Sequence, residues 1–363
     1  MSNFVFPQHG FALRPEGLLS GSVAVRAVKD GHALPLSGGP LAFTFCEIIA
    51  AGERPILSLS EARSWAAKAG RAEELAVALA RASARRSEFA GLSLDRPRIM
   101  SVVNVTPDSF SDGGDFAEAK VAIAHGLAMM EAGADILDIG GESTRPGSEP
   151  LPVEEELARV LPVVRALAAA DALVSIDTRR ARVMGEAIEA GARIVNDITA
   201  LAGDPESLAL VATSGLPVVL MHMQGEPRSM QANPVYADAP LDIRDFFVDR
   251  FAACRAAGIP AERIAVDPGI GFGKNDRHNI AVLRDLAVYH ELGSAIALGV
   301  SRKSFIGRLS RKEPPKQRVP GSLAAGLAGL DRGAQILRVH DVAETRQALG
   351  IWQAMAGSLS SAP

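Results

Sequence analysis

The sequence predicts an α/β fold: an eight-stranded parallel β/α barrel of the TIM type, with a small N-terminal α+β extension. Eight short apolar runs alternate with longer stretches of helical periodicity, which is the pattern of a closed parallel barrel. The runs are rich in Val, Ile and Leu, as expected of strands buried on both faces. The predicted strands are Ile99–Asn104, Ile136–Gly140, Leu173–Asp177, Ile194–Asp197, Val218–His222, Ile264–Asp267, Ile296–Ser301 and Ile336–His340.

Polar residues stand at the ends of these runs. Side chains that leave the carboxyl ends of barrel strands converge on one mouth, where such barrels carry out their chemistry. The sequence therefore predicts an enzyme with one shared cleft. The residues expected to face this cleft are Asn104, Asp138, Asp177, Asn196, Asp197, Asp267, Arg302, Lys303, Arg338 and His340.

Composition and charge limit the possible classes of protein. The chain has 363 residues, which allows one barrel of about 250 residues and about one hundred more. A net charge of −4 argues against a general nucleic-acid-binding surface, which requires a basic excess. Cys46 and Cys254 lie far apart without metal-ligand spacing, as is typical of a reduced compartment. The chain lacks a signal-peptide pattern and any run of about 18 apolar residues, so a cytoplasmic protein without a membrane partner is expected.

The pattern of alternating apolar runs and helical stretches begins near residue 95, and the sequence before it has a different pattern. The barrel is predicted to occupy residues 96–363, and residues 1–95 form an extension. Within the extension, Val23–Val28 and Leu41–Ile49 are expected strands, and Ser60–Ala90 is expected to form one broken helix or two short ones. No metal, nucleotide or phosphate motif occurs there, so packing on the barrel or oligomer contacts are the expected roles.

Several charged residues are interpreted as structural. Arg81, Arg85 and Arg86 are expected on a solvated helix face, and His125, His278 and His290 on the surfaces of helices. His222 is either a core histidine or a residue of the mouth, and the core is the preferred interpretation.

Two segments rich in Gly, Ser and Pro follow the first two strands. Asn104–Gly114 (NVTPDSFSDGG) is expected to form a mobile loop over the mouth. Asn104 offers a neutral oxygen suited to Mg²⁺, although a local turn is an equal alternative. Gly140–Pro150 (GGESTRPGSEP) offers a hydroxyl and a guanidinium in Thr144 and Arg145. These features indicate a lid over an anionic or planar substrate, or otherwise an ordinary exposed loop.

The later strand ends carry groups suited to a heterocycle and an anion. Asp177, Asn196 and Asp267 present donors and acceptors that can read a heterocycle edge. The segment 267–274 (DPGIGFGK) fails the spacing of a nucleotide P-loop, so its glycines and Phe272 are expected to contact a flat ligand, while Lys274 is either solvated or functional. The pair Arg338 and His340 shares one strand face near Ser301–Ser304, where many barrels bind phosphate.

Eight segments in this order closely resemble the dihydropteroate synthases of bacterial folate synthesis: NVTPDSFSDGG, DIGGESTRPGSEP, SIDT, NDI, MHMQG, DPGIGFGK, GVSRKSF and RVHD. The resemblance covers about residues 98–357 and leaves the first 95 outside. Ile270 is aliphatic where some relatives have an aromatic residue, which we expect to be tolerated.

The resemblance implies a pterin held deep in the barrel and a p-aminobenzoate site shaped by the loops. It implies condensation of 7,8-dihydropterin-6-ylmethyl diphosphate with p-aminobenzoate, an enzyme of the class that sulfonamides target, and a homodimer. The implied pterin-binding residues are Asp177, Asn196, Asp267 and Lys303, with Asp138 nearby. The implied diphosphate contacts are Arg338, His340 and Asn104, with Mg²⁺ near Asn104. The residues implied for the p-aminobenzoate site are Phe110, Asp112, Thr144, Arg145, Pro146 and Ser304.

Two alternatives stay open. A pterin-binding methyltransfer module would share the deep carboxylates but should lack the paired loops together with SRK and RVH. A non-catalytic pterin-binding homologue is disfavoured, because every motif position carries a chemically competent residue.

Overall fold

The computed structural model describes residues 9–86, 88–105, 114–143, 148 and 150–356, and it confirms the predicted barrel. Eight parallel strands run from β7 to β14 in chain order, and the barrel closes where β14 pairs with β7. The strands are β7 Arg98–Asn104, β8 Ile136–Gly140, β9 Val174–Asp177, β10 Ile194–Asp197, β11 Val218–Met221, β12 Ile264–Asp267, β13 Ala295–Leu298 and β14 Ile336–Val339.

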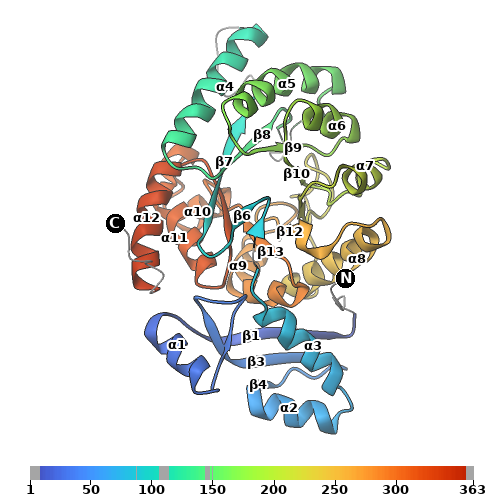
Figure 1. The fold of residues 1–363 in the computed structure, drawn as a ribbon, viewed down its shortest axis with the longest axis vertical. Coiled ribbons are helices and arrows are strands. Elements are labelled where there is room, and N and C mark those ends of the chain that lie inside the picture. The colour runs from blue at the N-terminus through green and yellow to red at the C-terminus, as the bar shows by residue number, and fades with distance from the viewer. Residues whose placement is uncertain (1–8, 87, 106–113, 144–147, 149, 357–363) are drawn as a thin grey trace.

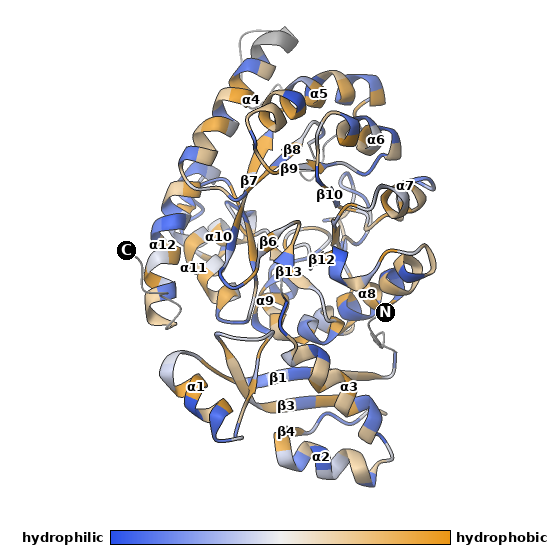
Figure 2. Ribbon diagram, in the orientation of Figure 1, coloured by the Kyte–Doolittle hydropathy of each residue, from blue (hydrophilic) through white to orange (hydrophobic). Residues whose placement is uncertain are grey.

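Helices surround these strands on the outside (Figure 1). They are α4 Gly114–Glu131, α5 Val153–Ala169, α6 Ala181–Glu189, α7 Ser207–Ser214, α8 Ala239–Ala256, α9 Asp276–Arg284, α10 Ser304–Leu309, α11 Val319–Leu330 and α12 Val342–Met355, with short 3₁₀ turns η2 Ala261–Arg263, η3 Leu286–Leu292 and η4 Pro315–Gln317. Hydrophobic and hydrophilic residues alternate along the helices, whereas β7 and β8 are mostly hydrophobic (Figure 2). The main core therefore lies between strands and helices.

The extension is a small sheet with helices, and it lies at one end of the molecule (Figure 1). β1 Phe11–Leu19 pairs antiparallel with β3 Ala42–Ala50, which also pairs with β2 Leu34–Pro35 and β4 Ile56–Ser58. The helices are α1 Gly21–Lys29, α2 Leu59–Lys68 and α3 Ala72–Ser83. The extension has a hydrophobic core of its own, formed by residues such as Leu13, Phe43 and Leu75.

The predicted strand Val23–Val28 is wrong, because this segment belongs to helix α1. Its valines are exposed, whereas Ala24 is buried against Ala33 and Ala42 and Ala27 packs beside them. The packing of small residues at a spacing of three has overridden the β-propensity of the valines.

The predicted helical stretch Ser60–Ala90 forms two short helices, α2 and α3, and ends earlier than expected. The chain then makes a hairpin of β5 Glu88–Phe89 and β6 Leu92–Ser93. Phe89 and Leu94 pack against residues at the amino ends of the barrel strands, such as Met100 and Ile136. This hairpin therefore closes the end of the barrel opposite the mouth.

A buried charged network joins the extension to the barrel. The Glu291 carboxylate accepts a hydrogen bond from the Leu13 backbone N–H at 2.6 Å and also pairs with Arg244. The Arg244 guanidinium donates in turn to the Phe11 carbonyl at 2.8 Å. Both Arg244 and Glu291 are almost completely buried, so the pairing compensates charges that would be costly if left alone.

Burial under the extension corrects two surface assignments. Arg86 is buried and donates to the carbonyls of His290 and Ser294, and His290 itself has no exposed surface. Neither residue lies on a solvated helix face, because the extension covers η3, in which His290 lies. His125 and His278 are half-buried. No helix within the described ranges is long and apolar enough to cross a membrane.

Candidate active site

Three charged residues from strands β8, β9 and β14 meet at the carboxyl end of the barrel. Arg338, on β14, donates from Nε to Asp138 on β8 and from Nη2 to Asp177 on β9, each at 2.6 Å. Ring closure makes this possible, since it brings β14 beside β7 and hence close to β8. The Asn196 amide, on β10, also donates to Asp138 at 3.0 Å.

One carboxylate oxygen of Asp138 accepts no hydrogen bond from the described residues. Oδ2 accepts from both Arg338 and Asn196, but Oδ1 is buried and has no hydrogen-bond partner among the residues that the structure describes. An unpaired buried acceptor is costly. It is therefore a position at which a ligand N–H or a water would be stabilised.

Asp267 and Lys303 form the other side of the pocket. Asp267 Oδ1 accepts from the Gly269 backbone N–H at 2.8 Å, which fixes the carboxylate at the end of β12. The Lys303 ammonium lies 4.1 Å from the centre of the Phe272 ring, in a cation–π contact. Phe272, on the loop that follows Asp267, therefore stabilises the Lys303 ammonium. The pocket as a whole combines carboxylates, one amide and two cations.

Burial dominates the electrostatics of this pocket. It raises the pKa of Asp177 to about 7, with further elevation from the negative Asp138 and Asp197, while Arg338 opposes the shift. Burial also raises the pKa of Asp267. It lowers the pKa of Lys303 to about 8, although Asp267 favours the charged form. Asp177 and Lys303 therefore both titrate near neutral pH.

His340 is held in its neutral form. Burial, followed by the positive charges of Arg338 and Arg302, lowers its pKa to about 3. Its Nδ1 lies 3.1 Å from Ser301 Oγ, and that hydroxyl also accepts from the His340 backbone N–H at 3.1 Å. The imidazole is thereby oriented by the segment that follows β13, and Nε2 is the ring nitrogen left for a ligand.

Two residues expected in the cleft lie elsewhere. Asp197 accepts hydrogen bonds from the backbone of Thr199 and Leu201. Neighbouring side chains along a strand point to opposite faces, and since Asn196 points into the barrel, Asp197 points away from it. Arg302 has a left-handed backbone with φ of 58° and pairs with Asp341 through Nε at 3.0 Å. This turn directs Arg302 away from the mouth and Lys303 toward it.

Lys274 is a structural residue that the sequence left undecided. It is fully buried and donates to the carbonyls of Gly269 at 2.9 Å and Phe272 at 3.0 Å. Its Nζ also lies 3.0 Å from His222 Nδ1. The solvated alternative is therefore wrong, and the preferred core position of His222 is confirmed, since His222 is buried and packs edge-on against Phe246.

The loop held by Lys274 has little conformational freedom. Gly269 has φ of 67°, and a Cβ at this position would lie 2.0 Å from the His222 carbonyl oxygen. Only glycine fits such a close backbone approach at positive φ. Since this loop also carries Phe272, Lys274 and Gly269 together determine where the aromatic ring lies beneath Lys303.

Replacing Lys274 with Met should lower the free energy of unfolding by about 2 kcal/mol, because the loop carbonyls lose their buried donor. Urea denaturation measures the change. Arg277→Met is the matched control, since Arg277 is exposed on the following helix and should change stability by less than about 0.5 kcal/mol. Equal losses in both variants would contradict the role given to Lys274.

The remaining predicted residues are partly outside the described chain. Asn104 ends β7 and is half-buried, in register with Gly140 of β8, and Ser304 is exposed at the start of α10. Phe110, Asp112, Thr144, Arg145 and Pro146 lie outside the described residues. Beside them, Glu142 accepts from the Leu151 backbone N–H at 3.0 Å.

The fold and the site define a β/α-barrel enzyme with a charged pocket at the carboxyl ends of its strands. The family model for pterin binding enzymes matches residues 100–340. Dihydropteroate synthase of Escherichia coli strain K12 is 46% identical over 264 residues, covering 72% of this chain and 93% of that protein. The enzyme of Neisseria meningitidis serogroup B is 48% identical, with coverages of 73% and 94%. This chain therefore belongs to the dihydropteroate synthase family of pterin binding enzymes.

Solved structures agree with this assignment. Dihydropteroate synthase of Xanthomonas albilineans with 4-aminobenzoic acid has a TM-score of 0.69 and 50% identity, and the match covers 72% of this chain and 94% of that one. The Yersinia pestis enzyme in a complex with a sulfonamide drug has a TM-score of 0.69 and 48% identity, with coverages of 73% and 96%. The family match begins at residue 100, so it does not include the extension.

Proposed function

We propose that this chain is a dihydropteroate synthase, a transferase that joins 7,8-dihydropterin-6-ylmethyl diphosphate to p-aminobenzoate and releases diphosphate. The observation that carries the proposal is the pocket formed by Asp138, Asp177, Arg338 and Asn196 at the mouth of a pterin-binding barrel. Asp138 Oδ1 is a buried acceptor without a donor among the described residues. It can therefore accept a hydrogen bond from a heterocycle that is rich in N–H groups, such as a pterin.

The pterin is the ligand for the deep part of this pocket. Asp177, Asn196 and Asp267 supply acceptors and an amide for its polar edge, with Asp138 beside them, and Lys303 supplies a donor. Phe272 adds an aromatic face against which a flat ring can pack. A set of fixed donors and acceptors of this kind favours a pterin over ligands that lack its ring N–H groups.

The reaction requires the C–O bond between the pterin methylene and diphosphate to break, with the electron pair leaving on oxygen. The positive charge that develops spreads over the pterin ring, and the buried carboxylates of Asp177 and Asp267 stabilise it. The aniline nitrogen of p-aminobenzoate then forms the C–N bond and loses a proton. No strong base is needed, since this nitrogen is already neutral.

The leaving group binds where Arg338 and His340 lie. Arg338 donates two N–H groups to carboxylates, and its other N–H groups can bind an anion, because a guanidinium has five. His340 is neutral, and its Nε2 is free to donate to the diphosphate when Nδ1 accepts from Ser301 Oγ. The residues assigned to p-aminobenzoate are Phe110, Asp112, Thr144, Arg145, Pro146 and Ser304, on the resemblance to the family.

Mg²⁺ is part of the proposal, with Asn104 as its protein ligand. No group of three or more acidic, His or Cys side chains that could hold a metal occurs in the described parts of the chain. One amide oxygen nevertheless fits Mg²⁺, which keeps several waters and is commonly held by one or two protein groups together with substrate phosphates. When bound, the ion would supply positive charge to the departing diphosphate. We also propose a homodimer in the cytoplasm, as the family resemblance implies.

A direct assay tests the proposed function. The purified chain is incubated with Mg²⁺, p-aminobenzoate and the pterin diphosphate, and both dihydropteroate and diphosphate are quantified. One diphosphate should be released for each dihydropteroate formed. Absence of dihydropteroate, with the pterin still bound in calorimetry, would overturn the synthase assignment and favour a non-catalytic pterin-binding protein.

The pH dependence of kcat/KM should be bell-shaped, with limbs near pH 7 and pH 8. Below the first limb Asp177, whose pKa is about 7, takes up a proton and no longer stabilises positive charge. Above the second limb Lys303, whose pKa is about 8, loses its proton. Initial rates at low pterin concentration report these free-enzyme values.

Lys303→Arg is the control for the alkaline limb. Arginine keeps its proton across this range, so the alkaline limb should disappear while the acid limb stays. A wild-type profile that is flat from about pH 6 to pH 9 would contradict the assignment of both groups.

A further inference from the structure

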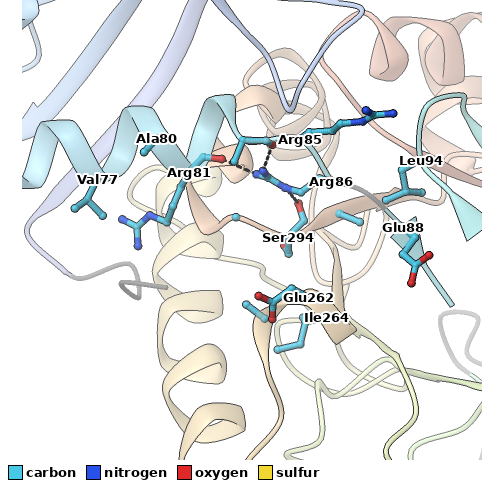
Figure 3. A pocket seen from close by; sticks show the side chains of 14 residues that line it. Val77, Ala80, Arg81, Arg85, Arg86, Glu88, Leu94, Glu262, Ile264 and Ser294 are labelled. Carbon is cyan, nitrogen blue, oxygen red and sulfur yellow. Dashed lines mark hydrogen bonds between the residues drawn. The ribbon is translucent and has the colours of Figure 1, made fainter. Parts of the chain in front are cut away.

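A cavity of about 350 Å³ lies at the junction of the extension and the barrel, at the end opposite the proposed active site (Figure 3). Ile264 and Ala295, the first residues of β12 and β13, line its barrel side. Val77 and Ala80 of α3 line its extension side. The family match begins at residue 100, so one wall of this cavity belongs to a part of the chain that lies outside this match.

A buried guanidinium lies at this cavity. Arg86 is 9% exposed and donates to the carbonyls of Arg81 at 2.8 Å, His290 at 2.9 Å and Ser294 at 3.2 Å, and also to that of Ala84. All four acceptors are neutral, and none of its hydrogen bonds in the described chain reaches a carboxylate. A buried cation without a counter-charge is costly, so the cavity favours an anion.

Arg86 also has one N–H group that none of these four hydrogen bonds uses. The four bonds use one N–H from Nε, one from Nη1 and two from Nη2. A guanidinium has five N–H groups, so one N–H on Nη1 stays available. This group can donate to a ligand without breaking the contacts that hold the arginine.

A second polar group supports the same end of the cavity. Ser294 is 2% exposed, and its Oγ has no hydrogen-bond partner within the described residues. Its carbonyl accepts from Arg86 Nε, so the two residues are neighbours on the same side of the cavity, as Figure 3 shows. A hydroxyl and a guanidinium side by side can both donate to one carboxylate.

The other walls restrict the kind of anion. Val77, Leu94 and Ile264 offer an apolar surface. The charged residues beside Arg86 are Arg81 and Arg85, of which Arg85 pairs with Asp95, and Glu88 and Glu262. A compact polar anion such as phosphate would leave the apolar surface uncovered. A single carboxylate on an apolar body fits both the donors of Arg86 and Ser294 and the apolar wall.

We propose that this cavity binds a small organic monocarboxylate. Its carboxylate accepts hydrogen bonds from Arg86 and Ser294, and its apolar body packs between α3 and the start of β12. The ligand would bridge the extension and the barrel, and it would therefore stabilise their junction by binding both.

Titration calorimetry on the full chain tests this site with three probes: benzoate, the neutral benzamide of nearly the same shape, and inorganic phosphate. Benzoate should bind, and benzamide and phosphate should bind at least tenfold more weakly. No benzoate binding up to about 10 mM, well into the weak range of ligand affinities, would overturn the proposal. Equal binding of benzamide would overturn the assignment of an anion site.

A pair of variants on α3 locates the bound probe. Ala80→Phe places a ring in the cavity, and Ala80 is exposed, so the fold should tolerate it. Ala76→Phe is the matched control, since Ala76 is exposed one turn earlier on α3 and does not line the cavity. Ala80→Phe should weaken benzoate binding at least tenfold, Ala76→Phe should leave it unchanged, and Ser294→Ala should weaken it at least threefold.

The same variants separate this cavity from the proposed p-aminobenzoate site, which would also accept an aromatic carboxylate. Both α3 variants should form dihydropteroate at the wild-type rate. Benzoate binding that persists in Ala80→Phe would place the probe elsewhere and overturn the proposal, while the proposed synthase function would be unaffected.

Discussion

Replacing Arg338 with Met should lower the free energy of unfolding by about 3–5 kcal/mol, the usual result of removing one partner of a buried ion pair. Arg338 is the cation that pairs with both Asp138 and Asp177 at 2.6 Å, and both carboxylates are largely buried. Without it, two negative charges stay close together in the barrel. The variant should also lose most synthase activity, because the diphosphate loses its proposed guanidinium contact.

The stability loss should depend on pH in a defined direction. Burial and the negative Asp138 raise the pKa of Asp177, whereas Arg338 lowers it, so the pKa of Asp177 should rise further in the variant. A carboxyl whose folded pKa is raised contributes stability at low pH and loses it as pH rises through that value. The difference between variant and wild type should therefore be smaller at pH 5.5 than at pH 8.

A second substitution serves as the control for this effect. Arg338→Met combined with Asp177→Asn removes one of the two unpaired charges, so it should recover part of the lost stability but none of the activity. Urea denaturation at both pH values measures the first effect, and the synthase assay measures the second. Equal stability of Arg338→Met and wild type at pH 8 would contradict a structural role for the ion pairs.

Replacing Lys303 with Met should lower kcat/KM by about 10- to 100-fold while leaving stability unchanged or slightly raised. A charge-assisted contact to the transition state is worth about 1.5–3 kcal/mol, which gives a rate change of this size. Burial lowers the pKa of Lys303 to about 8, so the folded state gains nothing from keeping the ammonium there. Met replaces the cation–π contact with an apolar side chain that can pack against the Phe272 ring.

Lys274→Met is the comparison for this variant, because both lysines lie beside the same loop. Lys274 donates to the loop carbonyls, whereas Lys303 faces Asp267 and Phe272. The first should therefore affect unfolding and the second catalysis. A Lys303→Met enzyme with the wild-type kcat/KM would overturn its assignment to the pterin site.

Much of the barrel could be predicted because its signal is local. A strand buried on both faces must be apolar wherever it lies, so the runs around Ile136 and Ile264 were recognisable without any tertiary information. The position at which an apolar run ends can also be seen in the local sequence. These ends predicted that Asp177, Asn196 and Asp267 lie at one mouth of the barrel. The β-propensity of Val23–Val28 failed because the extension buries the alanines of that segment and not its valines.

The sequence by itself determined the barrel, the position of its mouth and the identity of most residues there. Only the tertiary structure decided which charged residues are buried and with what partners. Arg302 and Arg338 look alike in sequence, yet one pairs with Asp341 and the other with two carboxylates across the closed barrel. Lys274 is buried between the carbonyls of its own loop and the distant His222, and Arg86 is buried against the carbonyls of the distant His290 and Ser294. The physical reason is that apolar periodicity is a property of neighbouring residues, whereas the energy of a buried charge depends on partners that only folding brings together.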